Sequence, residues 1–327
     1  MTYLLKYKKS GRIVAFLAVT LLLSNVRSSD AAEPQKEFPP AAAQRTLVLG
    51  RVSDNPKKHY KRLKAMADYM VAHMRDLGIV EAKVLMAKDR QQMTSYLKQG
   101  KVDWVTETPF AAVIFREEAG AEVLLRRWKS GVSEYFTIFF ARKDSGIRSF
   151  NGLTGKTIAF EDARSSSAYF VPASLLIDDG LKLTRLATAR EKPPAAKVGY
   201  VFAGDPINIT TLVYKRLIQA GAYSNLDWDD EDNLAKALRN ELHIFYTSKR
   251  FPRAIELVRK DLALRIKQRI KAVLLNIDKD PAAKSVLQGY EHTTKFDELD
   301  QEALSGLEEA RRIAKTVLSE LTTGEAD

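Results

Sequence analysis

Residues 46–52 (TLVLGRV) decide the class of fold, because they begin an alternation of strand and helix signals that runs through the chain. The run is short and apolar, which is typical of a buried strand. After a loop at 53–56, apolar residues recur at helical spacing from Leu63 to Leu77, and Gly78 follows where a helix C-cap is expected. The first unit is therefore a strand, a loop and a helix.

Further strand signals follow, and helical segments separate most of them. The expected strands are residues 82–87, 102–106, 121–125, 134–141, 156–160, 197–202, 220–223 and 242–247. Strands joined by helices predict an α/β fold with mostly parallel sheets that helices cover on both faces. Ligand sites in such folds lie at the carboxyl ends of the strands. The last helix is expected from Asp300, which suits an N-cap, to about Leu321.

The N-terminus has the order of parts of a secretory signal peptide. Basic residues between Lys6 and Arg12 precede an apolar run at 13–23, and small residues at Ser29 and Ala31 fit a cleavage site. The apolar run is shorter than the roughly 20 residues of a spanning helix; an uncleaved anchor is the alternative. We expect residues 1–32 to be a signal peptide and residues 33–45 a flexible leader.

Composition limits the class of protein. The chain has 327 residues and 45% hydrophobic content, which suits two domains. It has no cysteine, so it can form no disulfide, and an exported chain of this kind fits the bacterial periplasm. The net charge is +11, but the basic residues are scattered and lack interleaved aromatic residues, so we expect no nucleic-acid partner.

No enzyme motif is present in the sequence. There is neither a Gly-x-Ser-x-Gly elbow nor a phosphate-binding P-loop, and the four histidines are isolated without zinc-site spacing. Thiol chemistry is excluded because cysteine is absent. We therefore predict that the chain is not an enzyme and has no catalytic residues, no metal site and no cofactor.

Several segments, taken in order, resemble a known family. They are residues 100–103 (GKVD), 142–147 (RKDSGI), 153–160 (LTGKTIAF), 162–168 (DARSSSA), 251–253 (FPR) and 258–262 (VRKDL). In this order and spacing they resemble the phosphate/phosphite/phosphonate-type periplasmic solute-binding proteins of ABC transporters. The resemblance runs from about residue 46 to about residue 300.

The resemblance implies a class II periplasmic-binding-protein fold. Each of two lobes would be a mostly parallel sheet flanked by helices, and a two-strand hinge would join the lobes. Residues 46–140 with 228–327 would form lobe 1, and residues 141–227 would form lobe 2. A ligand between the lobes would favour their closed arrangement, because it binds that arrangement better than the open one.

The function that follows is that of a periplasmic substrate-binding component of an ABC importer, which binds a phosphonate-like or other small oxyanion. The alternative is a ligand-sensing module that presents the closed state to a membrane sensor kinase, since one fold can serve both roles. The expected partners are the oxyanion and either an ABC permease of the inner membrane or that kinase. We expect the protein to be a monomer.

Three consecutive serines are the leading candidates for the ligand site. Ser165, Ser166 and Ser167 lie between a strand and a helix, where hydroxyls and free backbone N–H groups favour an oxyanion. A simple helix N-cap is the alternative. Tyr60 and Tyr135 match family positions near the ligand, and a phenol can donate to an oxyanion; core or interface packing is their alternative.

Three further residues are candidates with less direct support. Glu107 ends a strand where the family has small neutral residues, so it would either pair with a cationic group of the ligand or face solvent or cap a helix. Asp205 follows a strand of the second lobe near a family ligand position. Tyr223 lies near another such position that is often acidic. Loop capping or packing is the alternative for both.

Overall fold

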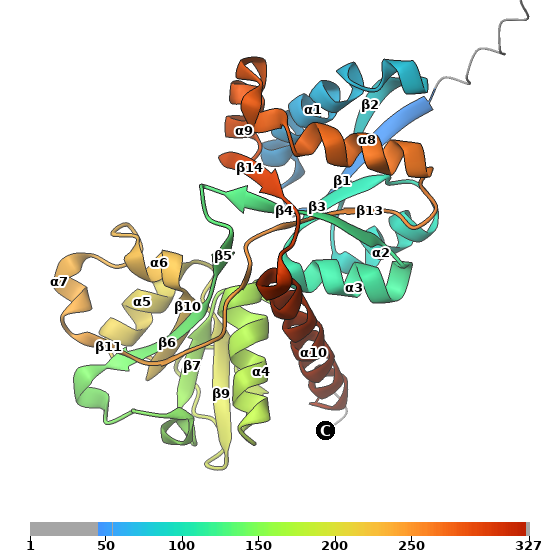
Figure 1. Ribbon diagram of the computed structural model, residues 1–327. Helices are drawn as coiled ribbons and strands as arrows, with labels where there is room; N and C mark the ends of the chain where they lie inside the picture. The colour runs from blue at the N-terminus through green and yellow to red at the C-terminus, as the bar shows by residue number, and fades with distance from the viewer. Residues whose placement is uncertain (1–44, 54, 325–327) are drawn as a thin grey trace, which may run out of the picture. The chain divides into compact units, whose positions relative to one another are not determined.

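The computed structural model describes residues 45–53 and 55–324 (Figure 1). The predicted signal peptide (1–32) and the predicted leader up to residue 44 lie outside the described residues. In the part of the chain that is described, no helix is both long enough and apolar enough to cross a membrane.

The first sheet has six strands in the order β14-β4-β13-β3-β1-β2. Its strands are β1 (Arg45–Val52), β2 (Ile79–Ala87), β3 (Trp104–Glu107), β4 (Glu122–Lys129), β13 (Ile255–Val258) and β14 (Thr293–Asp297). β1 runs parallel to β2 and β3, whereas β13 and β14 return antiparallel to their neighbours. The carboxyl ends of β1 and β3 therefore meet at one edge of the sheet.

The second sheet has six strands in the order β11-β6-β10-β7-β9-β8. Its strands are β6 (Thr137–Arg142), β7 (Thr157–Phe160), β8 (Lys182–Arg185), β9 (Lys197–Phe202), β10 (Ala220–Ser224) and β11 (Leu242–Thr247). β10, β7, β9 and β8 are mutually parallel, and β6 pairs antiparallel with β10 and β11. The carboxyl ends of β7 and β9 again share one edge.

Helices cover both faces of each sheet. Successive side chains of a strand point to opposite faces, so a strand with a continuous apolar run has apolar side chains to bury on both. The helices are α1 (Pro56–Ala72), α2 (Arg90–Lys98), α3 (Pro109–Ala119), α4 (Val171–Asp178), α5 (Pro206–Tyr214), α6 (Asn225–Asp229), α7 (Lys236–Arg239), α8 (Leu264–Leu274), α9 (Lys284–Gly289) and α10 (Gln301–Gly324). In β6, Ile138 and Phe140 pack in the core on the α5 side, while Phe139 and Ala141 pack in the core on the α4 side. Two helix-flanked sheets confirm the predicted α/β fold.

A separate two-stranded ribbon joins the two sheets. β5 (Glu134–Tyr135) pairs antiparallel with β12 (Phe251–Pro252), and Tyr135 lies opposite Phe251. β5 leads directly from the first sheet into the second, and β12 leads back, so this ribbon is the predicted two-strand hinge (Figure 1). The rings of Tyr135 and Phe251 meet edge to face with centroids 4.6 Å apart.

Sheet membership differs from the predicted lobe boundaries at 140/141 and 227/228. Residues 137–142 and 242–247 pair within the second sheet as β6 and β11. The lobe boundaries that the family resemblance implies instead put 137–140 and 242–247 in lobe 1. The expected single strand 134–141 is interrupted at Phe136, because Asn225 takes both of its backbone groups: Phe136 donates to Asn225 Oδ1 (3.0 Å), and the Asn225 N–H donates to the Phe136 carbonyl (2.9 Å). The chain therefore passes from the first sheet to the second at the hinge ribbon, before Thr137, and not at the expected boundary between residues 140 and 141.

The C-terminal helix α10 contacts both halves of the molecule and the hinge. Asp300 accepts from the Ala303 N–H (2.8 Å), as the predicted N-cap. Arg311 pairs with Glu117 of α3 (2.5 Å), and Arg312 pairs with Asp178 of α4 (2.7 Å). A Cβ on Gly306 would lie 3.1 Å from hinge backbone atoms, so α10 packs directly on β12.

Candidate functional site

Glu107 lies at the carboxyl edge of the first sheet. Its carboxylate accepts from the Val52 N–H at the end of β1 (3.0 Å) and from the Thr108 N–H (3.3 Å). Burial raises the pKa of Glu107, and the nearby Arg51 guanidinium opposes that rise. Thr108, and not Glu107, caps α3 through its side chain. Glu107 is thus a half-buried carboxylate held by backbone amides at the strand ends.

The three serines form the turn that follows β7. Ser165 is the N-cap, and its hydroxyl accepts from the Ala168 N–H (3.1 Å), as serine commonly does. The next residues form the helical turn η4 (Ser166–Phe170), which runs into α4. Ser166 is only 2% exposed, and its hydroxyl has no hydrogen bond of normal geometry to a described residue. The carbonyl of Ser167 accepts from the Thr137 hydroxyl (2.7 Å).

The hinge ribbon brings a tyrosine and an arginine to these serines. The Tyr135 hydroxyl interacts with those of Ser166 and Ser167, while burial raises the Tyr135 pKa. Arg253 follows β12 directly, and its guanidinium carbon lies 4.6 Å from the centre of the Tyr135 ring. Its buried Nε–H has no hydrogen-bond partner among the described residues. We call Tyr135, Ser166, Ser167 and Arg253 the hinge cluster.

The hinge cluster contains hydrogen-bond donors that make no hydrogen bond to the described residues. The Ser166 hydroxyl and the Arg253 Nε–H are both buried, and neither makes a hydrogen bond of normal geometry to a described residue. Buried polar groups are paired in the great majority of cases, and an unpaired one costs about 1–3 kcal/mol. An oxyanion placed among these donors would pair them and would also meet the charge of a guanidinium, which suits oxyanions.

Carboxyl groups border the hinge cluster on the side of the second sheet. The pKa of Glu161, the residue after β7, is raised to about 7, chiefly by burial and also by the charges of Asp227, Asp162 and Asp205. Burial also raises the pKa of Asp227, while the Arg253 charge lowers it. Raised pKa values leave these groups more protonated than free carboxylates, which reduces their repulsion of an anion. No three acidic or histidine side chains among the described residues are placed to hold a metal ion.

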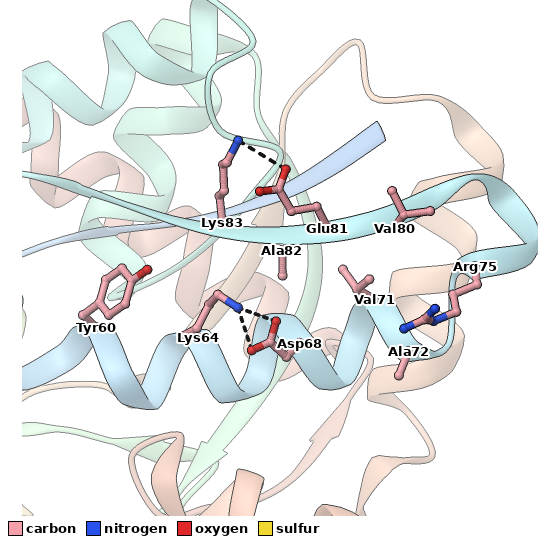
Figure 2. A pocket seen from close by; sticks show the side chains of 10 residues that line it. All are labelled: Tyr60, Lys64, Asp68, Val71, Ala72, Arg75, Val80, Glu81, Ala82 and Lys83. Carbon is pink, nitrogen blue, oxygen red and sulfur yellow. Dashed lines mark hydrogen bonds and ion pairs between the residues drawn. The ribbon is translucent and has the colours of Figure 1, made fainter. Parts of the chain in front are cut away.

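Five of the predicted site residues lie outside the hinge cluster: Glu107 and Ser165, described above, and Tyr60, Tyr223 and Asp205. Tyr60 is 48% exposed and lines a surface groove between α1 and β2 (Figure 2). Two ion pairs lie in this groove, one between Lys64 and Asp68 and the other between Lys83 and Glu81. None of the groove's lining residues belongs to the hinge cluster.

The other two residues occupy opposite environments in the second sheet. Tyr223 is fully buried against Phe140, and its hydroxyl shares a hydrogen bond with Thr210 (3.1 Å). Asp205 is exposed at the N-cap position of α5 and makes no side-chain capping bond. It is near enough to Glu161 to raise the pKa of that carboxyl.

The sequence-based prediction missed Arg253 and Glu161. Glu161 directly follows the strand at 156–160, so the rule that sites lie at carboxyl strand ends could have found it. Arg253 is part of the FPR segment, but only the pairing of β12 with β5 places it over Tyr135. That pairing joins residues more than 110 positions apart in sequence, and no local pattern reports it.

Comparison with known proteins defines the class. Residues 50–304 match the family model described as "ABC transporter, phosphonate, periplasmic substrate-binding protein". The chain belongs to this family of periplasmic substrate-binding proteins. It is therefore a solute-binding protein of the class II fold and not an enzyme.

Solved structures show the same fold. XAC2383 from Xanthomonas citri bound to chloride ion is 38% identical, with a TM-score of 0.77 over 84% of this chain and 99% of that chain. XAC2383 bound to ATP is 37% identical, with a TM-score of 0.77 over 84% and 98%. PhnD1 from Prochlorococcus marinus in complex with methylphosphonate is 18% identical, with a TM-score of 0.59 over 83% and 98%, which supports the fold alone.

Proposed function

We propose that this protein binds a phosphonate-like or other small oxyanion at the hinge cluster, between two lobes that close on it, and delivers it to the permease of an ABC importer. One observation carries the proposal: two buried donors, the Ser166 hydroxyl and the Arg253 Nε–H, lie beside Tyr135 and make no hydrogen bond of normal geometry to a described residue. A tetrahedral oxyanion offers several acceptors to converging donors of this kind.

The position of the hinge cluster suits closure. Tyr135 belongs to the hinge ribbon and Arg253 follows it directly, while Ser166 and Ser167 begin the turn that leads into α4, which packs on the second sheet. A ligand held by both would bind one arrangement of the lobes better than others, which is the requirement for a ligand-driven population shift. A permease could then distinguish loaded from empty protein without any chemical step.

Negative charge is common to the ligands of the similar proteins, and two of the three ligands carry phosphorus–oxygen groups. PhnD1 holds methylphosphonate, and XAC2383 has been solved with ATP and with chloride, all of which are anions. Our proposal for this chain is an anion of the phosphoryl type, with the group attached to phosphorus left to experiment.

A thermal-shift screen tests the ligand class. The panel contains methylphosphonate, phosphate, phosphite, sulfate and ATP, with a neutral sugar and a polyamine as controls. We expect one or more oxyanions to raise the Tm, because a ligand at 100 times its Kd adds about 2.7 kcal/mol to the free energy of unfolding. A Tm rise with the neutral or cationic solute alone would refute the oxyanion proposal and leave the fold unaffected.

The pH dependence of binding should report Glu161. As the pH rises through about 7, Glu161 loses its proton and becomes an anion beside Ser165 and Asp227. We expect oxyanion affinity to fall by roughly 3- to 10-fold between pH 6 and pH 8, because a like charge at this range contributes on the order of 1 kcal/mol. Titration calorimetry of wild type and Glu161→Gln at both pH values measures this.

The glutamine variant is also the control for the ligand's own ionisation, which is the same in both proteins. A pH profile unchanged by Glu161→Gln would contradict the prediction. The folded protein also binds more protons than the unfolded chain between the ordinary carboxyl pKa of 4.5 and about 7. The Glu161 contribution to stability therefore falls as pH rises through this window, and Glu161→Gln should remove that loss.

A further inference from the structure

Arg90 is another guanidinium to which no described residue gives an ion pair or hydrogen bond, and it belongs to a different element from the hinge cluster. It is the first residue of α2, a helix whose start is fixed by the N-cap Asp89, which accepts from the Gln92 N–H (2.7 Å). Its guanidinium carbon lies 4.7 Å from the centre of the Phe170 ring. Phe170 ends the same helical turn that Ser166 begins. Arg90 thus reaches from a helix of the first sheet to the serine turn of the second.

The location of Arg90 is electrostatically unfavourable. A cation in the first turn of a helix opposes the positive end of the helix dipole. Burial lowers the pKa of Arg90, and the charges of Glu107 and Asp162 oppose that effect without forming an ion pair with it. Among the described residues, none forms an ion pair or hydrogen bond with this guanidinium. Its contact with Phe170 is worth about 0.5–2 kcal/mol and leaves its N–H donors unused.

A row of contacting aromatic rings connects Arg253 with Arg90. Arg253 lies over Tyr135, which meets Phe251 at 4.6 Å. The row continues through Phe110, whose centroid lies 6.0 Å from Phe251 and 5.5 Å from Phe170, the ring under Arg90. The serine turn runs beside this row, from Ser166 next to Tyr135 to Phe170.

We propose that Arg90 is a second anion subsite, so that the protein takes ligands carrying two anionic groups, one at the hinge cluster and the other at Arg90. This rests on the proposed function, because it assigns the first oxyanion to the hinge cluster. The second group is a phosphate or a carboxylate linked to the first, as in a pyrophosphate, a longer polyphosphate or a phosphonocarboxylate. Binding such a ligand would give Arg90 the ion pair that the described residues do not provide.

Titration calorimetry with matched ligands tests this inference. The single-anion ligands are phosphate and methylphosphonate, and the two-anion ligands are pyrophosphate, tripolyphosphate and phosphonoacetate. We expect the wild type to bind at least one two-anion ligand about tenfold or more tightly than methylphosphonate. Arg90→Gln should abolish this preference while changing the methylphosphonate Kd by less than about twofold, and Arg90→Lys should restore part of it.

Two controls separate a ligand contact from a structural role. Lys88→Gln removes a charge two residues away, at an exposed position, and should leave the preference unchanged. The Tm of each unliganded variant shows whether Arg90 holds the fold. A wild type without preference for two-anion ligands, or an Arg90→Gln variant that weakens both ligand classes equally, overturns the inference while the proposed function stands. Failure of every anion to bind would overturn both.

Discussion

Replacement of Arg253 by glutamine is expected to weaken oxyanion binding by about 10- to 100-fold, since hydrogen bonds to charged groups contribute about 1.5–3 kcal/mol and each 1.4 kcal/mol is tenfold in Kd. The unliganded protein should lose no more than about 0.5–2 kcal/mol in its free energy of unfolding, which is the contact of the guanidinium with the Tyr135 ring, because the Arg253 Nε–H makes no hydrogen bond to a described residue. A rise in Kd that exceeds this loss in the free energy of unfolding would show that Arg253 acts mainly on the ligand and not on the fold. Calorimetry with methylphosphonate and thermal unfolding measure the two quantities.

Neighbouring residues provide matched controls. Arg250→Gln removes the same charge three residues earlier, where the guanidinium stacks on Phe136, and should leave the Kd unchanged. Ser166→Ala should weaken binding without lowering the Tm. Ser165→Ala should instead lower the free energy of unfolding by about 1 kcal/mol, because Ser165 is the N-cap. Equal binding by wild type and Arg253→Gln would show that the ligand lies elsewhere.

Replacement of Glu256 by alanine is expected to lower the free energy of unfolding by about 3–5 kcal/mol, which is the cost of breaking a buried ion pair from one side. Glu256 is fully buried and accepts from Trp104 Nε1 (2.6 Å) and the Thr106 hydroxyl (2.7 Å). Its carboxylate also lies 3.2 Å from Arg127, which is 3% exposed. The variant would leave that guanidinium with Glu291 as its remaining carboxylate.

Denaturant unfolding measures the effect, with Glu122→Gln as the control. Glu122 pairs with Lys267 on the surface (2.7 Å), and an exposed pair of this kind contributes less than about 1 kcal/mol. A loss below 1 kcal/mol for Glu256→Ala would contradict the importance of this buried network. The double variant Glu256→Leu with Arg127→Leu should recover part of the loss, because it leaves no buried charge unpaired at this contact.

The sequence was sufficient for most of the strands, because their apolar runs and turn residues are local signals. The expected strand at 197–202 is β9, and the expected strand at 242–247 is β11. The sheet that β11 joins was not predictable, because its partner β6 lies about 100 residues earlier and the run itself is compatible with either sheet. The hinge interruption at Phe136 likewise depends on Asn225, a residue far along the chain.

The candidate site was predictable only in part. The serine turn and Tyr135 came from motif order, and the structure brings Ser166, Ser167 and Tyr135 together. Tyr223 illustrates the limit, because strand alternation places it on the α5 face of β10, where it packs against Phe140. Arg253 and Arg90 could not be singled out among 52 basic residues, because their contacts with Tyr135 and Phe170, at the two ends of the serine turn, exist only in three dimensions.

A crystal structure of the protein with methylphosphonate tests the central proposal most directly. The account predicts phosphonate oxygens within about 2.7–3.2 Å of Ser166 Oγ and Arg253 Nε, with the Tyr135 hydroxyl also in contact. Methylphosphonate found instead in the groove lined by Tyr60, with Ser166 and Arg253 still without partners, would contradict it.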